Sequence, residues 1–243
     1  MPGIGKGTCR AGTQIGSVPN MCSEPFKTIL KRLCIAIIFS IAFAYVEAAV
    51  VVYLREIFHP AGFTFPLTNF PSIVHWQRLL LTEIGREAAT LVIILASSWL
   101  FGRSRQQRFA FFLAIFAVWD IFFYVWLKVL LNWPASLMDW DILFLIPITW
   151  AGPVLAPLFV SLTLLVFSVI ILYRCSRGTP LKPSPADWVG LTLAGLVVVV
   201  SFCIAGRHVA QPDFRSYFYW PLFALGNLSA IALFTRRLLK SES

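Results

Sequence analysis

The chain has 243 residues, of which 58% are hydrophobic and only 13% are charged, and its mean hydropathy is +0.79. A soluble domain carries about 25% charged residues, so this composition fits a lipid bilayer better than water. The formal net charge is +9, from 20 Lys and Arg against 11 Asp and Glu. Most of these bases lie in the tails and in the loops between apolar segments, where membrane proteins carry Lys and Arg that set their orientation. We therefore expect no nucleic-acid partner.

The first 26 residues are expected to form a flexible cytoplasmic tail. Residues 2–8, Pro-Gly-Ile-Gly-Lys-Gly-Thr, resemble the phosphate-binding loop of adenylate kinases. Such a loop works because a buried strand precedes it and a helix follows it, which aims backbone N–H groups at phosphate. Here no apolar strand precedes the motif, and the residues after it are rich in Gly, Thr and Ser. We therefore expect no nucleotide partner.

Six apolar segments are long enough to cross a bilayer as helices. The expected spans are residues 33–54, 79–101, 109–131, 154–173, 188–206 and 219–234. They form one transmembrane domain, residues 27–237, followed by a short tail, residues 238–243. The predicted fold class is all-α: a polytopic membrane protein with six transmembrane helices. A signal peptide cleaved near Ala42-Phe43-Ala44 is the alternative for the first span, but the apolar run continues to Leu54 and exceeds the apolar core of such a peptide.

The apolar region from Ile142 to Tyr173 is too long for one plain span. Four residues that disfavour a regular helix interrupt its first half: Pro147, Gly152, Pro153 and Pro157. Proline removes a backbone donor, and irregular backbone at membrane depth has to be buried in protein or face water. We expect a short interfacial or re-entrant segment at about 142–152, before the fourth span.

The basic residues predict the orientation of the spans. Fourteen of the 20 lie in the N-terminal tail, the loops 102–108 and 174–187 and the C-terminal tail, whereas four lie in the loops on the other side. Because an excess of Lys and Arg marks cytoplasmic segments, we expect both termini to be cytoplasmic. The expected location is the cytoplasmic (inner) membrane, in a multi-pass arrangement.

The predicted outer loops contain the histidines and a pair of acids. His59 and His75 share the loop 55–78 with Glu56, and they are the candidates for a metal site, with solvated histidines as the alternative. Asp141, in the outer loop before the fourth apolar region, is expected to cap the helix that follows. The five cysteines contain no CxxC pair, and the sequence leaves the identity of any cofactor unknown.

Ionisable residues within the predicted spans are confined to the first three helices. They are Glu47 in the first span, Glu83, Arg86 and Glu87 in the second, and Asp120 and Lys128 in the third. Helical spacing places them on stripes: Ser40, Ala44 and Glu47; Glu83, Glu87 and Thr90; Asp120 and Tyr124. We expect these stripes to line one polar pocket in the outer half of the membrane.

The charges of this pocket do not balance, because four acids face two bases. Unpaired carboxylates in low-dielectric surroundings take up protons or bind a cation, and intramembrane acids often serve such purposes. The pocket residues proposed to bind protons or cations are Glu47, Glu83, Arg86, Glu87, Asp120 and Tyr124. A structural cluster of salt bridges is the alternative for the same residues.

Three classes of function fit this pattern. The first is a proton- or cation-coupled carrier of a small solute, in which the segment interrupted by Pro and Gly lies near the site. The second is a non-catalytic membrane subunit or assembly factor whose buried charges specify helix pairing with partner subunits. The third is a membrane-embedded enzyme with a metal held by the acids and His59 or His75. No nucleophile or metalloprotease motif is present, which favours a protein that is not an enzyme.

Overall fold

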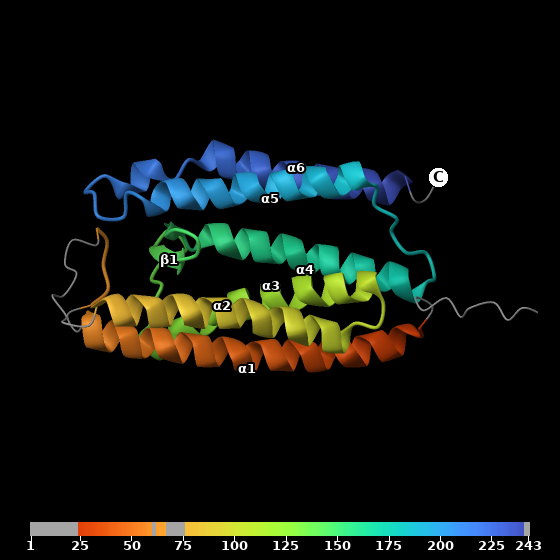
Figure 1. Ribbon diagram of the computed structural model, residues 1–243, viewed down its shortest axis with the longest axis horizontal. Coiled ribbons are helices and arrows are strands. Elements are labelled where there is room, and N and C mark those ends of the chain that lie inside the picture. Colours follow the sequence, from red (N-terminus) through yellow and green to blue (C-terminus); the bar gives the residue numbers. More distant parts are fainter. Residues whose placement is uncertain (1–23, 60–61, 67–75, 241–243) are drawn as a thin grey trace, which may run out of the picture.

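The computed structural model describes residues 24–59, 62–66 and 76–240; most of the predicted tails lies outside the described residues. Six long helices form most of the described chain: α1 (Phe26–Phe58), α2 (Trp76–Phe101), α3 (Arg105–Leu131), α4 (Leu155–Ser176), α5 (Pro185–Gly206) and α6 (Trp220–Lys240). They run side by side along the long axis, and α1 begins at the end of the bundle where α6 finishes (Figure 1). We call that end, where the α2–α3 and α4–α5 loops also lie, the terminal end. The opposite end, where the hairpin of residues 140–153 lies, is called the loop end.

Five helical segments are long and apolar enough to cross a membrane: α1, α3, α4, α5 and the segment Phe214–Lys240, which joins a short 3-10 helix, η1 (Phe214–Tyr217), to α6. The helix α2 is not among the five, and it carries Glu83, Arg86 and Glu87 in its first half. These findings are consistent with a multi-pass helical membrane protein. The six helices lie close to the predicted segments, and the number that crosses a bilayer remains a prediction.

Polar residues fix the starts of two of the helices. Ser104 precedes α3 and accepts a hydrogen bond from the backbone N–H of Gln107. Ser184 precedes α5 and forms a reciprocal capping box with Asp187, while Pro185 occupies the first helical turn. Side-chain acceptors at this position satisfy backbone donors that the first turn leaves unpaired, and they extend both helices about one turn beyond the predicted apolar segments.

The segment predicted to be interfacial or re-entrant is an antiparallel β-hairpin. It consists of β1 (Trp140–Phe144) and β2 (Trp150–Pro153), with Trp140 paired to Pro153 and Ile142 to Ala151. A hairpin satisfies most of its backbone groups by itself, which suits a segment whose prolines prevent a helix. The fold is therefore nearly, but not entirely, all-α.

Asp141 does not cap α4, so that prediction was wrong. Asp141 lies in β1, opposite Gly152, and the residue before α4 is Val154, whose side chain makes no capping hydrogen bond. Instead, the backbone N–H of Val154 donates to the carbonyl of Asp139 at 2.9 Å. The strand pairing places the Asp141 side chain in the interior rather than at a helix start.

The helices form two groups that meet at the hairpin. α3 is the central helix of the first group and packs against α1, α2 and α4. α5 and α6 pack against each other as a separate pair on the far side of α4 (Figure 1), and α5 rests on β2 near the loop end. The contact with the hairpin is close: a Cβ added to Gly206, the last residue of α5, would lie 1.8 Å from the carbonyl oxygen of Thr149.

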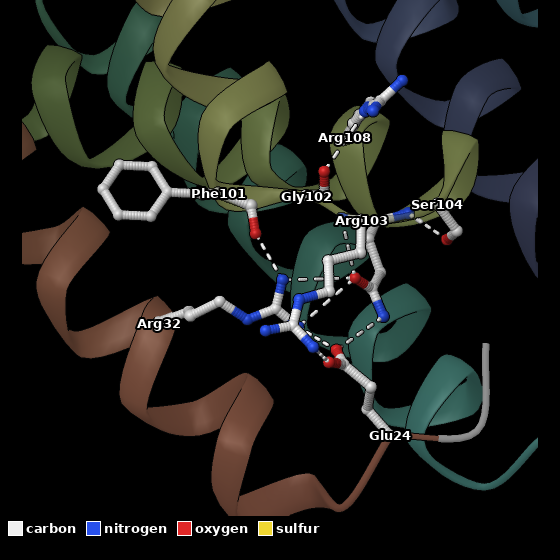
Figure 2. A network of polar contacts seen from close by, with 8 residues as sticks. Glu24, Arg32, Phe101, Gly102, Arg103, Ser104 and Arg108 are labelled. Carbon is white, nitrogen blue, oxygen red and sulfur yellow. Dashed lines mark hydrogen bonds and ion pairs between the residues drawn. The ribbon is translucent and has the colours of Figure 1, made fainter. Parts of the chain in front are cut away.

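Charged residues join the helices at the terminal end. The Glu24 carboxylate forms ion pairs with Arg32 of α1 and with Arg103 of the α2–α3 loop, and Arg32 also donates to the carbonyl of Phe101 (Figure 2). Between α5 and α6, Arg236 Nη2 lies 2.9 Å from Asp187 Oδ1. Gln106 of α3 donates to the carbonyl of Leu181 and so joins the first group to the α4–α5 loop.

Candidate functional site

A cavity of about 540 Å³ lies between the α3–α4 face and the α5–α6 pair. All six helices and the hairpin contribute to its lining, which is mainly apolar and aromatic. Near the loop end, the acids of the first three helices reach it. Glu47 lies eleven residues before Phe58, Glu87 eleven residues after Trp76, and Asp120 eleven residues before Leu131. At about 1.5 Å per residue, all three lie roughly 16 Å from the loop ends of their helices.

The predicted stripes on these helices are buried except for Glu83, which is half-buried. Ser40 and Ala44 are fully buried on α1, and Thr90 is buried on α2. The exposed fractions of Glu47, Glu87 and Asp120 are 5%, 6% and 8%. The structure therefore brings the three acids to one cavity, at one depth, and away from the exposed surface of the helix bundle.

Glu47 belongs to an ion-pair network between α1 and α2. The Arg86 guanidinium pairs with Glu47, and its Nε lies 2.8 Å from Glu83 Oε2 one turn earlier on α2. The Thr90 hydroxyl donates to Glu47 Oε1 at 2.7 Å. Glu83 does not line the cavity, whereas Glu47, Arg86 and Thr90 do. Arg86 thus neutralises part of the charge of two carboxylates at the same time.

Glu87 contacts the hairpin rather than a base. The backbone N–H of Leu145, in the turn between β1 and β2, donates to Glu87 Oε2 at 2.8 Å. A hydrogen bond to a carboxylate is stronger than one between neutral groups, so this contact holds the tip of the hairpin against α2. The interrupted segment predicted near the site is therefore in direct contact with one of its acids.

Asp120 is the acid at the α3–α4 interface. The hydroxyl of Ser161, on α4, donates to Asp120 Oδ2 at 2.8 Å. Tyr124 lies one turn further along α3, is 4% exposed, and also lines the cavity. The Tyr124 hydroxyl is hydrogen-bonded to the Asp141 carboxylate of β1.

A second buried ion pair lies beside this group and was not predicted. Arg55 Nη2 of α1 lies 3.1 Å from Asp141 Oδ1, and the Arg55 guanidinium lies 4.3 Å and 3.9 Å from the ring centroids of Phe63 and Trp133. Burial raises the pKa of Asp141 to about 6, against the opposing effect of the Arg55 charge and of hydrogen bonds from Ile142 and Tyr124. Within the sequence, Arg55 reads as an ordinary loop residue after an apolar span, and only the fold reveals its partner.

One other residue that was expected to face the pocket, Lys128, lies elsewhere. Lys128 is exposed and donates to the carbonyl oxygens of Asn132 and Pro134, at 3.3 Å and 2.9 Å, so its assignment to the pocket was wrong. Its long side chain reaches the polar groups at the end of α3, as lysines near helix ends in membranes commonly do.

Of the two histidine candidates for a metal, the structure describes His59. His59 follows α1, and its ring contacts that of Phe63. Partial burial and the nearby Arg55 charge lower the pKa of His59. His75 lies outside the described residues. Within the described part of the chain, no three His, Cys, Asp or Glu side chains are grouped so as to hold a metal ion.

The charged residues that line the cavity do not balance. They are Glu47, Glu87, Asp120 and Arg86: three carboxylates and one guanidinium, the latter shared with Glu83 as well. In the described structure Glu87 and Asp120 each bind one neutral donor, a backbone N–H and a hydroxyl. Such carboxylates in apolar surroundings are stable when they carry a proton or face a cation.

Comparisons of the chain with protein-family models, with curated proteins and with solved structures gave no match. The class of the protein therefore follows from its own fold and composition. Five apolar helices of sufficient length, with a buried polar site among them, are consistent with a multi-pass integral membrane protein.

Proposed function

We propose that this protein is a carrier of the cytoplasmic membrane that binds a small solute in the cavity between α3–α4 and α5–α6. Release of the solute is coupled to the uptake of protons by Glu87 and Asp120. The observation that carries the proposal is the convergence of three buried carboxylates, with one guanidinium, on a cavity of about 540 Å³. Pockets for small molecules commonly have volumes of about 300–1,000 Å³ and few, convergent polar groups.

The orientation of the carrier follows from its basic residues. Both termini and the loops rich in Lys and Arg lie on the cytoplasmic side, so the terminal end faces the cytoplasm and the loop end faces outward. The three acids then lie nearer to the outer surface. The hairpin covers them from the loop end, and Leu145 joins it to Glu87.

Coupling arises because a proton and a solute compete for the same acids. A buried carboxylate that loses its proton needs another positive partner, and one that is protonated no longer attracts it. Arg86 remains paired with Glu47 and Glu83 in either case, so it holds the acid-rich end of the cavity together. Each exchange at Glu87 or Asp120 then replaces one proton by one bound group of the solute.

The test uses the purified protein in liposomes that contain a pH-sensitive dye. A panel of organic cations, zwitterions, sugars and organic anions is added outside, and proton movement across the membrane is recorded. We expect one class of solute to move protons with the wild-type protein and with the control variant Lys128→Met, which lacks a charge outside the cavity. The variants Glu87→Gln and Asp120→Asn should show no proton movement. Each variant should still elute from size-exclusion chromatography as a single symmetric peak, which shows that it is folded.

Two outcomes contradict the carrier. One is proton movement in Glu87→Gln and Asp120→Asn equal to that of the wild type, and the other is the absence of any response across the panel. Purification in mild detergent tests the alternative function. Partner proteins that co-purify in stoichiometric amounts would favour a membrane subunit or assembly factor of a larger complex.

A further inference from the structure

We infer that the cavity takes an amphiphilic cation: a quaternary or protonated amine carrying an apolar tail about as long as one leaflet of a bilayer. This inference names the substrate class of the proposed carrier and rests on the same cavity. Three features of the cavity support it: the charge at one end, the aromatic rings beside that charge and the apolar lining that continues from it.

The acid-rich end selects for positive charge. Glu87 and Asp120 face the cavity with neutral hydrogen-bond donors as partners, and Arg86 is occupied by Glu47 and Glu83. An ionised carboxylate accepts about four hydrogen bonds, so one donor leaves acceptor sites available to a ligand. An anionic ligand would meet three carboxylates at close range, which costs several kcal/mol for like charges in a site of this kind.

Aromatic rings line the cavity near these acids. Trp119 precedes Asp120 on α3, and its ring centroid lies 6.3 Å from that of Phe144 in β1. Phe144 lies 5.5 Å from Trp150 in β2, and Trp150 is stacked at 6.4 Å on Phe202 of α5. All four rings line the cavity. Aromatic faces attract organic cations, and groups of them bind quaternary ammonium ions in particular.

The lining then continues as an apolar strip toward the terminal end. Phe116, Phe112 and Phe109 of α3 follow one face over eleven residues from Asp120, which corresponds to about 16 Å. Leu164 and Phe167 of α4 lie along the same cavity. About 16 Å is half of the hydrocarbon thickness of a typical bilayer, so the strip matches one acyl-length tail.

The charge preference is tested with two probes of the same shape and opposite charge. Radiolabelled tetraphenylphosphonium and tetraphenylborate are equilibrated with the protein in nanodiscs, and binding to empty nanodiscs is subtracted. We expect saturable binding of the phosphonium only, unchanged in Lys128→Met and weakened about tenfold or more in Glu87→Gln and Asp120→Asn, since tenfold corresponds to about 1.4 kcal/mol. Equal binding of the borate, or unchanged phosphonium binding in both variants, overturns the inference.

The tail is tested by competition on the wild-type protein. Dodecyltrimethylammonium should displace the phosphonium at much lower concentration than tetramethylammonium does, and Phe167→Ala should reduce that difference. Equal potency of the two ammonium ions overturns the assignment of the tail.

A third measurement needs no variant. Phosphonium binding should weaken as the pH is lowered, because protons compete for Glu87, which faces Arg86, Glu47 and Glu83, and for Asp120, which faces Asp141. Binding that is independent of pH contradicts this competition and the inference with it.

These outcomes separate the substrate class from the proposed function. Phosphonium binding in nanodiscs without proton movement in liposomes contradicts the carrier and leaves the ligand class standing. Proton movement driven by a hydrophilic zwitterion or a small organic cation, without phosphonium binding, contradicts the ligand class and leaves the carrier standing.

Discussion

Arg55 of α1 and Asp141 of β1 form a buried ion pair, with Arg55 Nη2 3.1 Å from Asp141 Oδ1. The pair joins the loop end of the first helix group to the hairpin, and the hairpin in turn contacts Glu87 through Leu145. The rings of Phe63 and Trp133 cover the guanidinium. This pair therefore positions the segment that borders the acid-rich end of the cavity.

Removal of one partner of this pair should destabilise the protein strongly. Arg55→Met leaves Asp141 buried without its base, and breaking a buried ion pair in this way costs about 3–5 kcal/mol. The double variant Arg55→Met/Asp141→Leu replaces the pair by apolar side chains and should recover most of the loss. Melting midpoints in detergent at about pH 8 measure both effects. A double variant as unstable as Arg55→Met would show that the pair is not the source of the loss.

The pH dependence of stability should depend on Asp141. Burial raises the pKa of Asp141 in the folded chain to about 6, from an ordinary value of 3.8, which is the reverse of the usual salt-bridged carboxylate. The folded state therefore binds the proton more tightly than the unfolded state does. The resulting stabilisation is complete below pH 3.8 and is lost as the pH rises through about 6.

We therefore expect the melting midpoint of the wild-type protein to rise between about pH 7.5 and pH 5, relative to that of Asp141→Asn. The charged and titratable groups that face Asp141 are Arg55 and Tyr124, with Asp120 one turn from Tyr124. These groups remain in the variant, so the difference between the two curves isolates Asp141. Parallel curves over this range would contradict the assigned pKa.

The contact between α5 and the hairpin should tolerate no side chain at Gly206. A Cβ there would lie 1.8 Å from the Thr149 carbonyl oxygen, so Gly206→Ala must displace backbone and should cost roughly 1–3 kcal/mol or more. Gly195 is the matched control on the same helix, because a Cβ there meets nothing within 4 Å. Gly195→Ala should be neutral or stabilising by up to about 1 kcal/mol. Equal melting midpoints for the two variants would contradict the close packing.

Much of the helical arrangement could be predicted from apolar length alone. Runs of about twenty apolar residues predict membrane helices because lipid offers no partner for the backbone. The sequence could not predict that residues 140–153 pair as strands. Pro147 and Pro153 exclude a helix, but the choice of a hairpin depends on Phe202, Phe218 and Gly206, which pack against it from distant parts of the chain.

The acids of the candidate site could be located from periodicity, because helical spacing sets the face and residue count sets the depth. Their partners could not. Glu87 binds a backbone N–H, and Asp120 binds Ser161 of α4, and neither donor carries a sequence signature. Lys128 was assigned wrongly because a long side chain does not end at the depth of its Cα atom.

The cavity also has a consequence for every affinity measured on this protein. In the proposed carrier, a mainly apolar space of about 540 Å³ lies within a bilayer whose hydrocarbon chains can enter it, and its aromatic walls gain dispersion energy from whatever fills it. An incoming amphiphile therefore exchanges with lipid or detergent rather than with water. Its apparent dissociation constant then reflects its affinity relative to that of the displaced lipid or detergent, and it is expected to change with the acyl chains that surround the protein.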